Sequence, residues 1–197
     1  MYRRNPLEDN QFYHVYNRGA NHKRLFFTAR DYRAFEATLM YQAARHQVDL
    51  PVYALMPNHF HFLLHQRAGG SIPGMMAGLC TSAAMCFNKR TGDTGPVFEG
   101  PYKAKWLPGD ALWDVACYIH LNPSRAKLVD APEKWGFSDF FAYKSNLTSY
   151  AIKSVDYTVR FDQEYVAHVQ QVLTNEKVEG RYRDRLRKGG YMLDEAE

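Results

Sequence analysis

Residues 50–65, LPVYALMPNHFHFLLH, contain two mainly hydrophobic runs separated by Met-Pro-Asn, and histidine alternates with phenylalanine at the start of the second run. This pattern predicts two β-strands joined by a short turn at residues 56–58, and therefore an antiparallel hairpin. Successive side chains of a strand point to opposite faces, so His59 and His61 share one face. The other face is apolar beside this pair and is expected to pack on a core: Phe60, Phe62 and Leu64.

Strand patterns also occur before and after this hairpin. Residues 12–16 are aromatic and β-branched, and they predict a first strand that ends in a turn at residues 17–19. Residues 97–106 predict a further strand, interrupted by a Gly-Pro pair. Alternation puts Lys103 and Lys105 together on one face of its second half, and they flank the histidines if that face is the histidine face.

Apolar residues recur at helical spacing in four other segments. The first helix follows a capping box at residues 28–31 and extends to about residue 47. The second begins at the cap residue Ser71, and the third begins at the cap residue Asp110. The third ends at Asn122, because the residue before a proline disfavours helix. A fourth is indicated near the C-terminus by Tyr165, Val169, Val172 and Leu173.

The order of these elements is β-α-β-β-α-β-α, which resembles the split βαβ arrangement of ferredoxin-like and RRM-like folds. We therefore expect an α+β fold with an antiparallel sheet, helices on one face and the histidine pair on the open face. Residues 1–145 are predicted to form the main domain. Residues 146–197 are predicted to form a helical, basic C-terminal extension that is mobile from about residue 177.

Composition supports a protein with a sizeable core, since 46% of the 197 residues are apolar. No apolar run approaches the roughly 18 residues that a transmembrane helix needs, and the N-terminus lacks the apolar stretch of a signal peptide. We expect no membrane segment and a cytoplasmic location. The three cysteines lack C-x-x-C spacing and are expected to be buried thiols in a reducing compartment: Cys80, Cys86 and Cys117.

The positive charge of the chain is concentrated near its end. Residues 181–188, RYRDRLRK, contain five of the 25 basic residues and one of the 21 acidic ones, which leaves 20 of each elsewhere. A basic segment on a neutral body suggests an anionic partner, most commonly nucleic acid, although a solvated tail is the alternative. If extended, the segment places four arginines on one side, and if helical it spreads them around the axis: Arg181, Arg183, Arg185 and Arg187.

Two features suggest chemistry. Two imidazoles side by side on a rigid strand form half of a metal site, and the alternative is one buried and one surface histidine without a ligand. Tyr118 lies four residues before Asn122, on the shoulder of the apolar stripe of the third helix. A tyrosine at such a position is ordinarily a packing residue, and a nucleophile is the alternative.

Three stretches become specific when they are taken together: YHVYNRG at residues 13–19, LMPNHFHFLL at residues 55–64 and YIHLNPSRA at residues 118–126. They resemble the single-tyrosine transposases of the HUH nuclease superfamily, in the form found in REP-associated tyrosine transposases. The resemblance covers roughly residues 12–145, which it identifies as the catalytic domain, and it does not extend to the C-terminal extension.

The resemblance implies that His59 and His61 bind a divalent metal ion, Mg²⁺ or Mn²⁺, and that Tyr118 is the nucleophile. Many relatives have a glutamine four residues after the tyrosine as the third ligand. Here Asn122 has the same amide oxygen on a stem one methylene shorter, so metal distance or ion preference can differ. No nucleotide cofactor is implied.

The implied activity is cleavage of single-stranded DNA next to REP-type hairpins, through a 5′-phosphotyrosine intermediate and with strand transfer. The implied partner is hairpin DNA of a bacterial nucleoid. A monomer is favoured over the dimer known among insertion-sequence relatives. The expected DNA contacts are basic residues: Arg18, Lys23, Arg24, Lys103, Lys105, Arg125, Arg181, Arg183, Arg185 and Arg187. The basic octet is expected to contact DNA away from the catalytic centre, or to cover the active face without DNA.

Three other functions compete with this one. A non-catalytic nucleic-acid-binding protein would use an RRM-like sheet, although a clear aromatic RNP pattern is absent. A metal-dependent hydrolase would activate water and use Tyr118 only for packing. A structural protein would carry the H-x-H pattern by coincidence.

Overall fold

The chain forms two compact units in this computed structural model, which describes residues 6–147, 150–153 and 158–191. Unit 1 comprises Met1–Leu50 and Leu55–Trp106, and unit 2 comprises Pro51–Ala54 and Leu107–Glu197. Across the described residues, we find no helix with the length and hydropathy that spanning a membrane requires. The predicted boundary at residue 145, between a catalytic domain and a C-terminal extension, stays a prediction.

Unit 1 is built on a four-stranded sheet with the order β2-β3-β1-β4. Its strands are β1 (Gln11–Arg18), β2 (Val48–Met56), β3 (His59–Gln66) and β4 (Lys103–Leu107). β1 runs antiparallel to β3 along its whole length, from Gln11 opposite Gln66 to Arg18 opposite His59. This order confirms the predicted ferredoxin-like α+β fold, in which the two βαβ connections interleave their strands.

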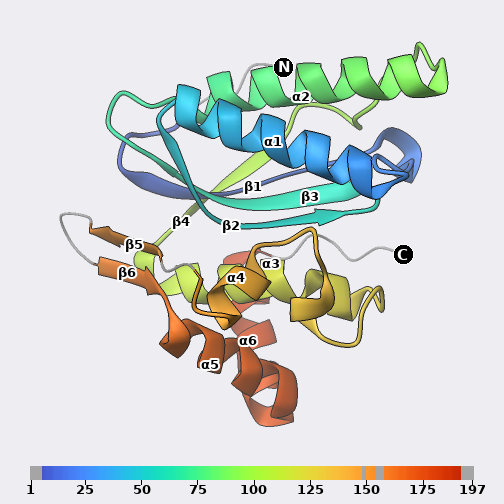
Figure 1. The fold of residues 1–197 in the computed structure, drawn as a ribbon. Coiled ribbons are helices and arrows are strands. Elements are labelled where there is room, and N and C mark those ends of the chain that lie inside the picture. Colours follow the sequence, from blue (N-terminus) through green and yellow to red (C-terminus); the bar gives the residue numbers. More distant parts are fainter. Residues whose placement is uncertain (1–5, 148–149, 154–157, 192–197) are drawn as a thin grey trace. The chain divides into compact units, whose positions relative to one another are not determined.

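Two helices cover one face of this sheet, α1 (Ala29–Arg45) and α2 (Ile72–Thr91), as Figure 1 shows. The predicted caps are present, since the Asp31 carboxylate accepts from the Thr28 N–H and the Ser71 hydroxyl accepts from the Gly74 N–H. Gly92 ends α2 in the left-handed conformation with φ of 71°. Phe60 of β3 packs against Phe35 of α1, with ring centroids 5.4 Å apart, so the side chain of Phe60 points to the helix-covered face.

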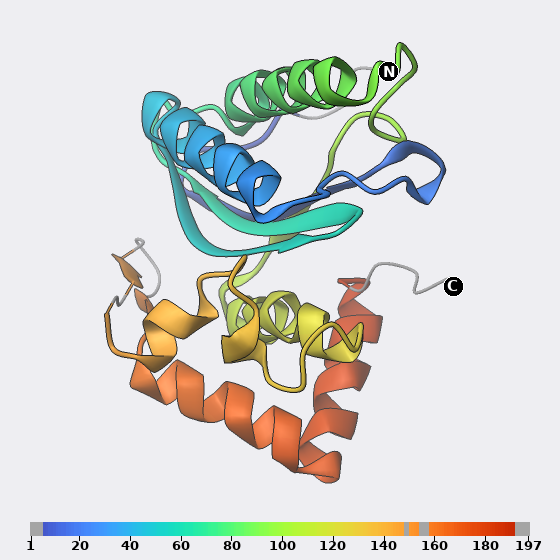
Figure 2. The ribbon, with the colours of Figure 1, turned by 45° about the vertical axis from the view of Figure 1, so that its right-hand side comes forward.

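Unit 2 is largely helical and contains α3 (Leu112–Arg125), α4 (Phe140–Lys144), α5 (Gln163–Thr174) and α6 (Glu176–Gly189). A two-stranded sheet of β5 (Tyr150–Lys153) and β6 (Thr158–Phe161) precedes α5. Figure 2 shows α5 and α6 in orange and red beside α3, and both helices contact it. Short 3-10 turns complete the chain: Ala20–His22 in unit 1, Gly109–Ala111 and Pro132–Lys134 in unit 2.

The third helix differs from the prediction at both ends. Asp110 lies inside a 3-10 turn and does not cap α3, whose N-cap residue is Ala111. The helix continues past Asn122 and through Pro123 to Arg125. Pro123 lies in the last turn, where its missing N–H removes only one helical hydrogen bond. The terminus is then closed by hydrogen bonds from Ala126 N to Asn122 O and from Leu128 N to Pro123 O.

The C-terminal segment is a packed helix over residues 176–189, so the predicted mobility from residue 177 is wrong there. Tyr182 and Leu186 of α6 are fully buried, and these two residues, four apart, form the buried stripe of a short amphipathic helix. Residues 192–197 lie outside the described part of the chain. Of the cysteines predicted to be buried, Cys117 is buried, Cys80 is half-buried and Cys86 is exposed on α2.

Candidate functional site

The histidines of the predicted metal site lie on the face of the sheet opposite α1 and α2. In the β1–β3 ladder, Arg18 is paired with His59 and Tyr16 with His61. Residues paired across an antiparallel ladder point to the same face, and so does His14, two residues before Tyr16. We call these five side chains the histidine face. Adjacent strands therefore bring together residues that are more than 40 positions apart in the sequence.

The two imidazoles of the H-x-H motif lie edge to face. The ring centroids of His59 and His61 are 5.1 Å apart, and their planes make an angle of 88°. Nδ1 of His59 is 2.7 Å from Oδ1 of Asn58, and Nδ1 of His61 is 3.0 Å from Nε2 of His14. Both rings are thus held through Nδ1, which is how a histidine that coordinates a metal through Nε2 is usually oriented.

Burial makes these imidazoles weak bases. Burial, and after it the Arg18 guanidinium, lowers the pKa of His59 to about 4. Burial, followed by His59, His14 and Arg18, lowers the pKa of His61 well below 6.5. The pKa of His14 falls to about 3 through burial and the nearby Lys105. All three rings are neutral at pH 7, and neutral imidazole is the form that binds metals.

The predicted basic residues of β4 lie beside this face. The Lys103 ammonium lies 5.8 Å from the centre of the Tyr16 ring, and Lys105 acts electrostatically on His14. Arg18 acts in the same way on His59 and His61. The prediction that the two lysines flank the histidines is therefore confirmed, and positive charge surrounds the imidazoles.

The other basic residues of the first loop lie elsewhere. The Lys23 ammonium forms a 2.8 Å ion pair with Asp93 and lies 5.5 Å from the centre of the Phe87 ring of α2. These contacts place Lys23 beside α2, and its predicted contact with DNA stays a prediction. Arg24 donates from Nε to the carbonyl oxygen of Phe26 at 2.7 Å.

Tyr118 and Asn122 lie on α3 in unit 2. Tyr118 is only 1% exposed, where a position on the helix shoulder was predicted. The run 114–121 of α3 is buried throughout, and α5 and α6 both contact this helix. Within the described part of the chain, the buried Nδ2 of Asn122 has no hydrogen-bond partner. The nitrogen and oxygen of an amide can exchange by a flip, so this position can present Oδ1 to a cation instead.

The remaining predicted basic residues belong to the seam between α3 and α6. Arg125 donates to the Tyr182 hydroxyl at 3.2 Å and lies 3.5 Å from Glu179. Arg185 forms a two-pronged ion pair with Asp114, at 2.5 and 2.7 Å. The other arginines of the octet are more peripheral: Arg183 lies 3.1 Å from Glu179, Arg187 lies 3.9 Å from Asp184, and Arg181 is exposed.

Two histidines of potential importance were not singled out from the sequence. His14 alternates with Tyr16 and Arg18 along β1, and this alternation is the sequence signal that places it on their face. His120 of α3 is buried and bridges two partners, with Nδ1 2.7 Å from the Tyr165 hydroxyl and Nε2 2.9 Å from Asp139. Nothing in the local sequence indicated this network, because both partners lie in later elements.

The five side chains of the histidine face include no carboxylate and no thiol. Within the described ranges, no group of three or more His, Cys, Asp or Glu side chains is arranged to hold a metal ion. A metal ion bound by His59 and His61 therefore needs a ligand of another type, such as an amide oxygen, water or a phosphate oxygen.

Comparison with known proteins identifies the fold. No protein-family model and no curated protein matches the sequence. The structure is similar to that of a REP-associated tyrosine transposase bound to a REP hairpin, with a TM-score of 0.61 and 13% identity over 80% of this chain and 90% of the other.

Two other solved structures have TM-scores below 0.5 and carry no argument. A candidate transposase from Deinococcus radiodurans has a TM-score of 0.41 and 17% identity, over 60% of this chain and 95% of the other. A bacterial tRNA(His) guanylyltransferase-like protein in complex with GTP has 0.46 and 13%, over 64% and 68%.

Proposed function

We propose that the protein is a metal-dependent endonuclease and strand transferase that cleaves single-stranded DNA next to REP-type hairpins through a 5′-phosphotyrosine at Tyr118. The carrying observation is the oriented, neutral pair of His59 and His61 on a sheet whose fold is similar to that of a REP-associated tyrosine transposase. The likeness supports the fold, and the activity is our inference from the residues.

The candidate metal ligands are Nε2 of His59, Nε2 of His61 and the amide oxygen of Asn122. They fit a Mg²⁺ or Mn²⁺ ion in two respects: the imidazoles are held through Nδ1, and their lowered pKa values mean that no proton must leave before binding. When bound, such an ion neutralises charge on the scissile phosphate and fixes its orientation.

Tyr118 would attack the scissile phosphorus with its phenolic oxygen. An oxygen–phosphorus bond to the tyrosine forms, and the bond between phosphorus and the 3′-oxygen breaks. The phenol loses its proton, the departing 3′-oxygen gains one, and the DNA remains attached through its 5′-phosphate. Because an unperturbed tyrosine has a pKa of about 10, removal of the phenolic proton needs assistance. The covalent linkage conserves a reactive phosphodiester for rejoining.

The DNA would be bound mainly through its backbone by the cations beside the histidines, Arg18, Lys103 and Lys105, with further contacts from Arg125 and the exposed arginines of α6. In this proposal the protein acts as a monomer in the bacterial cytoplasm, at the nucleoid. About six phosphate contacts would lower affinity on the order of 10³-fold between 50 and 200 mM salt.

A second candidate is a hairpin-binding protein without catalysis. The observation that favours it is the burial of Tyr118, which is 1% exposed, since a buried hydroxyl does not reach a phosphate. The two functions differ in one product, a covalent protein–DNA adduct.

The deciding experiment incubates the full chain with a 3′-labelled single strand that carries a REP-type hairpin, in Mn²⁺ or Mg²⁺, and resolves the products on a denaturing gel. The label stays with the fragment that a 5′-phosphotyrosine retains. We expect an adduct with the wild type and none with Tyr118→Phe, although the variant should bind the hairpin within about twofold.

Two further variants complete this experiment. His59→Ala should also abolish the adduct, and Tyr41→Phe, an exposed tyrosine of α1, is the matched control and should behave like the wild type. Hairpin binding by the wild type without an adduct in either metal would establish the non-catalytic candidate.

A further inference from the structure

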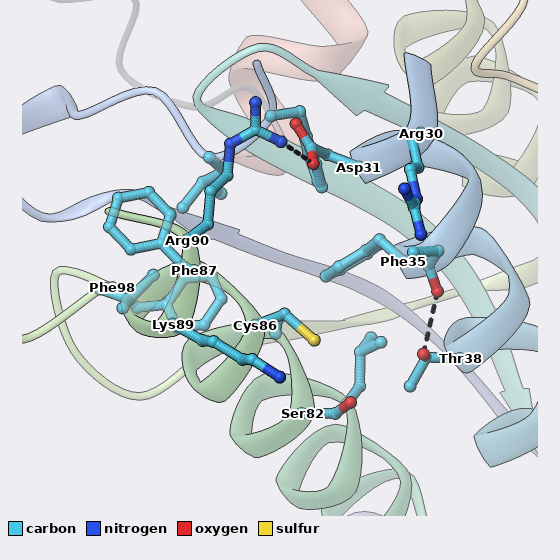
Figure 3. A pocket seen from close by; sticks show the side chains of 16 residues that line it. Arg30, Asp31, Phe35, Thr38, Ser82, Cys86, Phe87, Lys89, Arg90 and Phe98 are labelled. Atoms are coloured by element: carbon cyan, nitrogen blue, oxygen red, sulfur yellow. Dashed lines mark hydrogen bonds and ion pairs between the residues drawn. The ribbon is translucent and has the colours of Figure 1, made fainter. Parts of the chain in front are cut away.

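A cavity of about 530 Å³ lies between α1 and α2, on the side of the sheet opposite the histidine face (Figure 3). We propose that this cavity binds a medium-chain acyl carboxylate, with its hydrocarbon chain between the helices and its carboxylate at Arg30 and Lys89. The size is within the roughly 300–1,000 Å³ of small-molecule sites. The proposal is independent of the proposed DNA activity.

The cavity arises from the way in which the two helices diverge. Near the end of α1, glycines of α2 permit close approach, because a Cβ at Gly78 would lie 2.6 Å from the Gln42 side chain and one at Gly74 would lie 2.6 Å from His46. Toward the other end, small side chains of both helices leave space between the larger lining residues. Three of these small side chains, from the two helices, line the space: Ala34, Ser82 and Ala83.

The walls and the rim of the cavity differ in chemistry. The inner wall consists of buried apolar residues, among them Phe35, Leu79, Phe87 and Val97. The exposed lining residues include three cations, Arg30, Lys89 and Arg90. Apolar surface in an open cavity gains free energy when a ligand removes it from water.

Only two of the three cations can serve a ligand. Arg90 forms an ion pair with Asp31 and lies over the ring of Phe27, so its charge is neutralised and it ties the end of α2 to the start of α1. Arg30 projects from α1 and Lys89 from α2, as Figure 3 shows. Within the described part of the chain, neither has an ion-pair or hydrogen-bond partner. Arg30 and Lys89 therefore leave two uncompensated positive charges on opposite walls of the cavity, which favours an anionic group on the ligand.

The apolar wall of the cavity favours a ligand that is apolar apart from its charged group. A nucleobase carries several polar edge atoms, and burying them without partners is costly. The cavity offers few such partners, because the Thr38 hydroxyl already donates to the Ala34 carbonyl oxygen at 2.9 Å. A hydrocarbon chain has no polar atoms to satisfy. A single carboxylate at its end matches the two unpaired cations, and a cationic head group would be repelled.

The rate at which a thiol reagent modifies Cys86 can report whether the cavity is occupied. The thiol of Cys86 points into the cavity from α2 and belongs to an exposed residue (Figure 3). Burial raises the pKa values of Cys80 and Cys117 to about 12, and thiolate is the reactive form. A thiol reagent should therefore modify Cys86 first, and a ligand in the cavity should protect it.

The experiment measures the rate of Cys86 modification in the full chain, with dodecanoate titrated below its micelle concentration. We expect saturable protection of at least fivefold, with one dodecanoate bound per chain by calorimetry. Dodecyltrimethylammonium should not protect, and dodecanol, which has the same chain without charge, should protect weakly. Cys86→Ser, which lacks the reporter thiol, should show no fast phase.

Charge variants separate site binding from general adsorption. Arg30→Gln combined with Lys89→Gln should weaken dodecanoate binding about tenfold or more and leave dodecanol binding unchanged, since charge-assisted contacts alone are lost. Arg45→Gln, an exposed cation of α1 outside the cavity, is the matched control. Absence of saturable protection, equal protection by the cationic detergent, or an unaltered affinity in the double variant would overturn the proposal.

Discussion

The histidine face of unit 1 and the seam between α3 and α6 in unit 2 accommodate ionisable side chains in opposite ways. At the histidine face, burial and neighbouring cations keep three imidazoles uncharged. At the seam, charges are retained because each has an opposite charge in contact, as in the pair of the buried Asp114 and the exposed Arg185. The neutral imidazoles of the first region suit a charged ligand such as a metal ion. The paired charges of the second region suit a lasting contact between α3 and α6.

The seam also contains buried side chains. Tyr182 is fully buried, packs between helices and accepts a hydrogen bond from Arg125 at 3.2 Å. Removal of α6 would therefore take buried side chains out of unit 2. α6 contributes apolar core and charge compensation to unit 2.

The largest effect is expected from Tyr182→Ala, which should destabilise unit 2 by roughly 3–5 kcal/mol, the usual cost of removing a buried aromatic side chain. Chemical denaturation followed by far-UV circular dichroism measures it. Tyr182→Phe keeps the ring and loses only the hydroxyl, so it should cost about 1 kcal/mol. A loss below 1 kcal/mol for the alanine variant would mean that α6 does not support unit 2.

An intermediate effect is expected from acid at the histidine face. The folded-state pKa of His14 is about 3 and its unfolded-state value is near 6.5, so only the unfolded state takes up a proton between these values. Its contribution to stability is complete above pH 6.5 and is lost as the pH falls toward 3. At pH 4.5 the loss relative to pH 7 is about 2–3 kcal/mol.

His14→Gln tests this sign in metal-free protein. The variant should lose less stability than the wild type between pH 7 and pH 4.5, by about 2–3 kcal/mol, in denaturant titrations at each pH. His22→Gln, an exposed histidine, is the matched control and should follow the wild type. An identical pH dependence in all three proteins would show that His14 does not titrate as its burial requires.

The smallest effect is expected from Asp114→Asn, which removes the charge that faces Arg185. The Asp114 side chain is 9% exposed but that of Arg185 is 54% exposed, so solvent screens the loss and the cost should be about 1 kcal/mol. The difference should shrink in 1 M salt. Asp130→Asn breaks an exposed pair with Lys134 and should be nearly neutral. Equal losses of stability in both variants would show that the ion pair of the seam stabilises the protein no more than an exposed ion pair does.

Much of the fold was predictable because its determinants are local. Strand alternation placed His59 and His61 on one face, and Thr28 and Ser71 begin α1 and α2 as caps. The strand order followed from the sequence of elements, since a split βαβ arrangement allows few ways to bury one face of the sheet. His59 and His61 are the part of the candidate site that strand alternation alone predicts.

Other features depend on residues that meet only after folding. His14 supports His61 from 47 residues away, and Arg185 finds Asp114 from 71 residues away. Residues 114–121 of α3 are buried throughout, which local periodicity does not indicate, and the cavity beside Arg30 is lined by residues of two helices. Local periodicity describes which side of an element is apolar. Only tertiary packing decides what covers that side, and therefore which charges are neutralised, which are compensated and which remain available to a ligand.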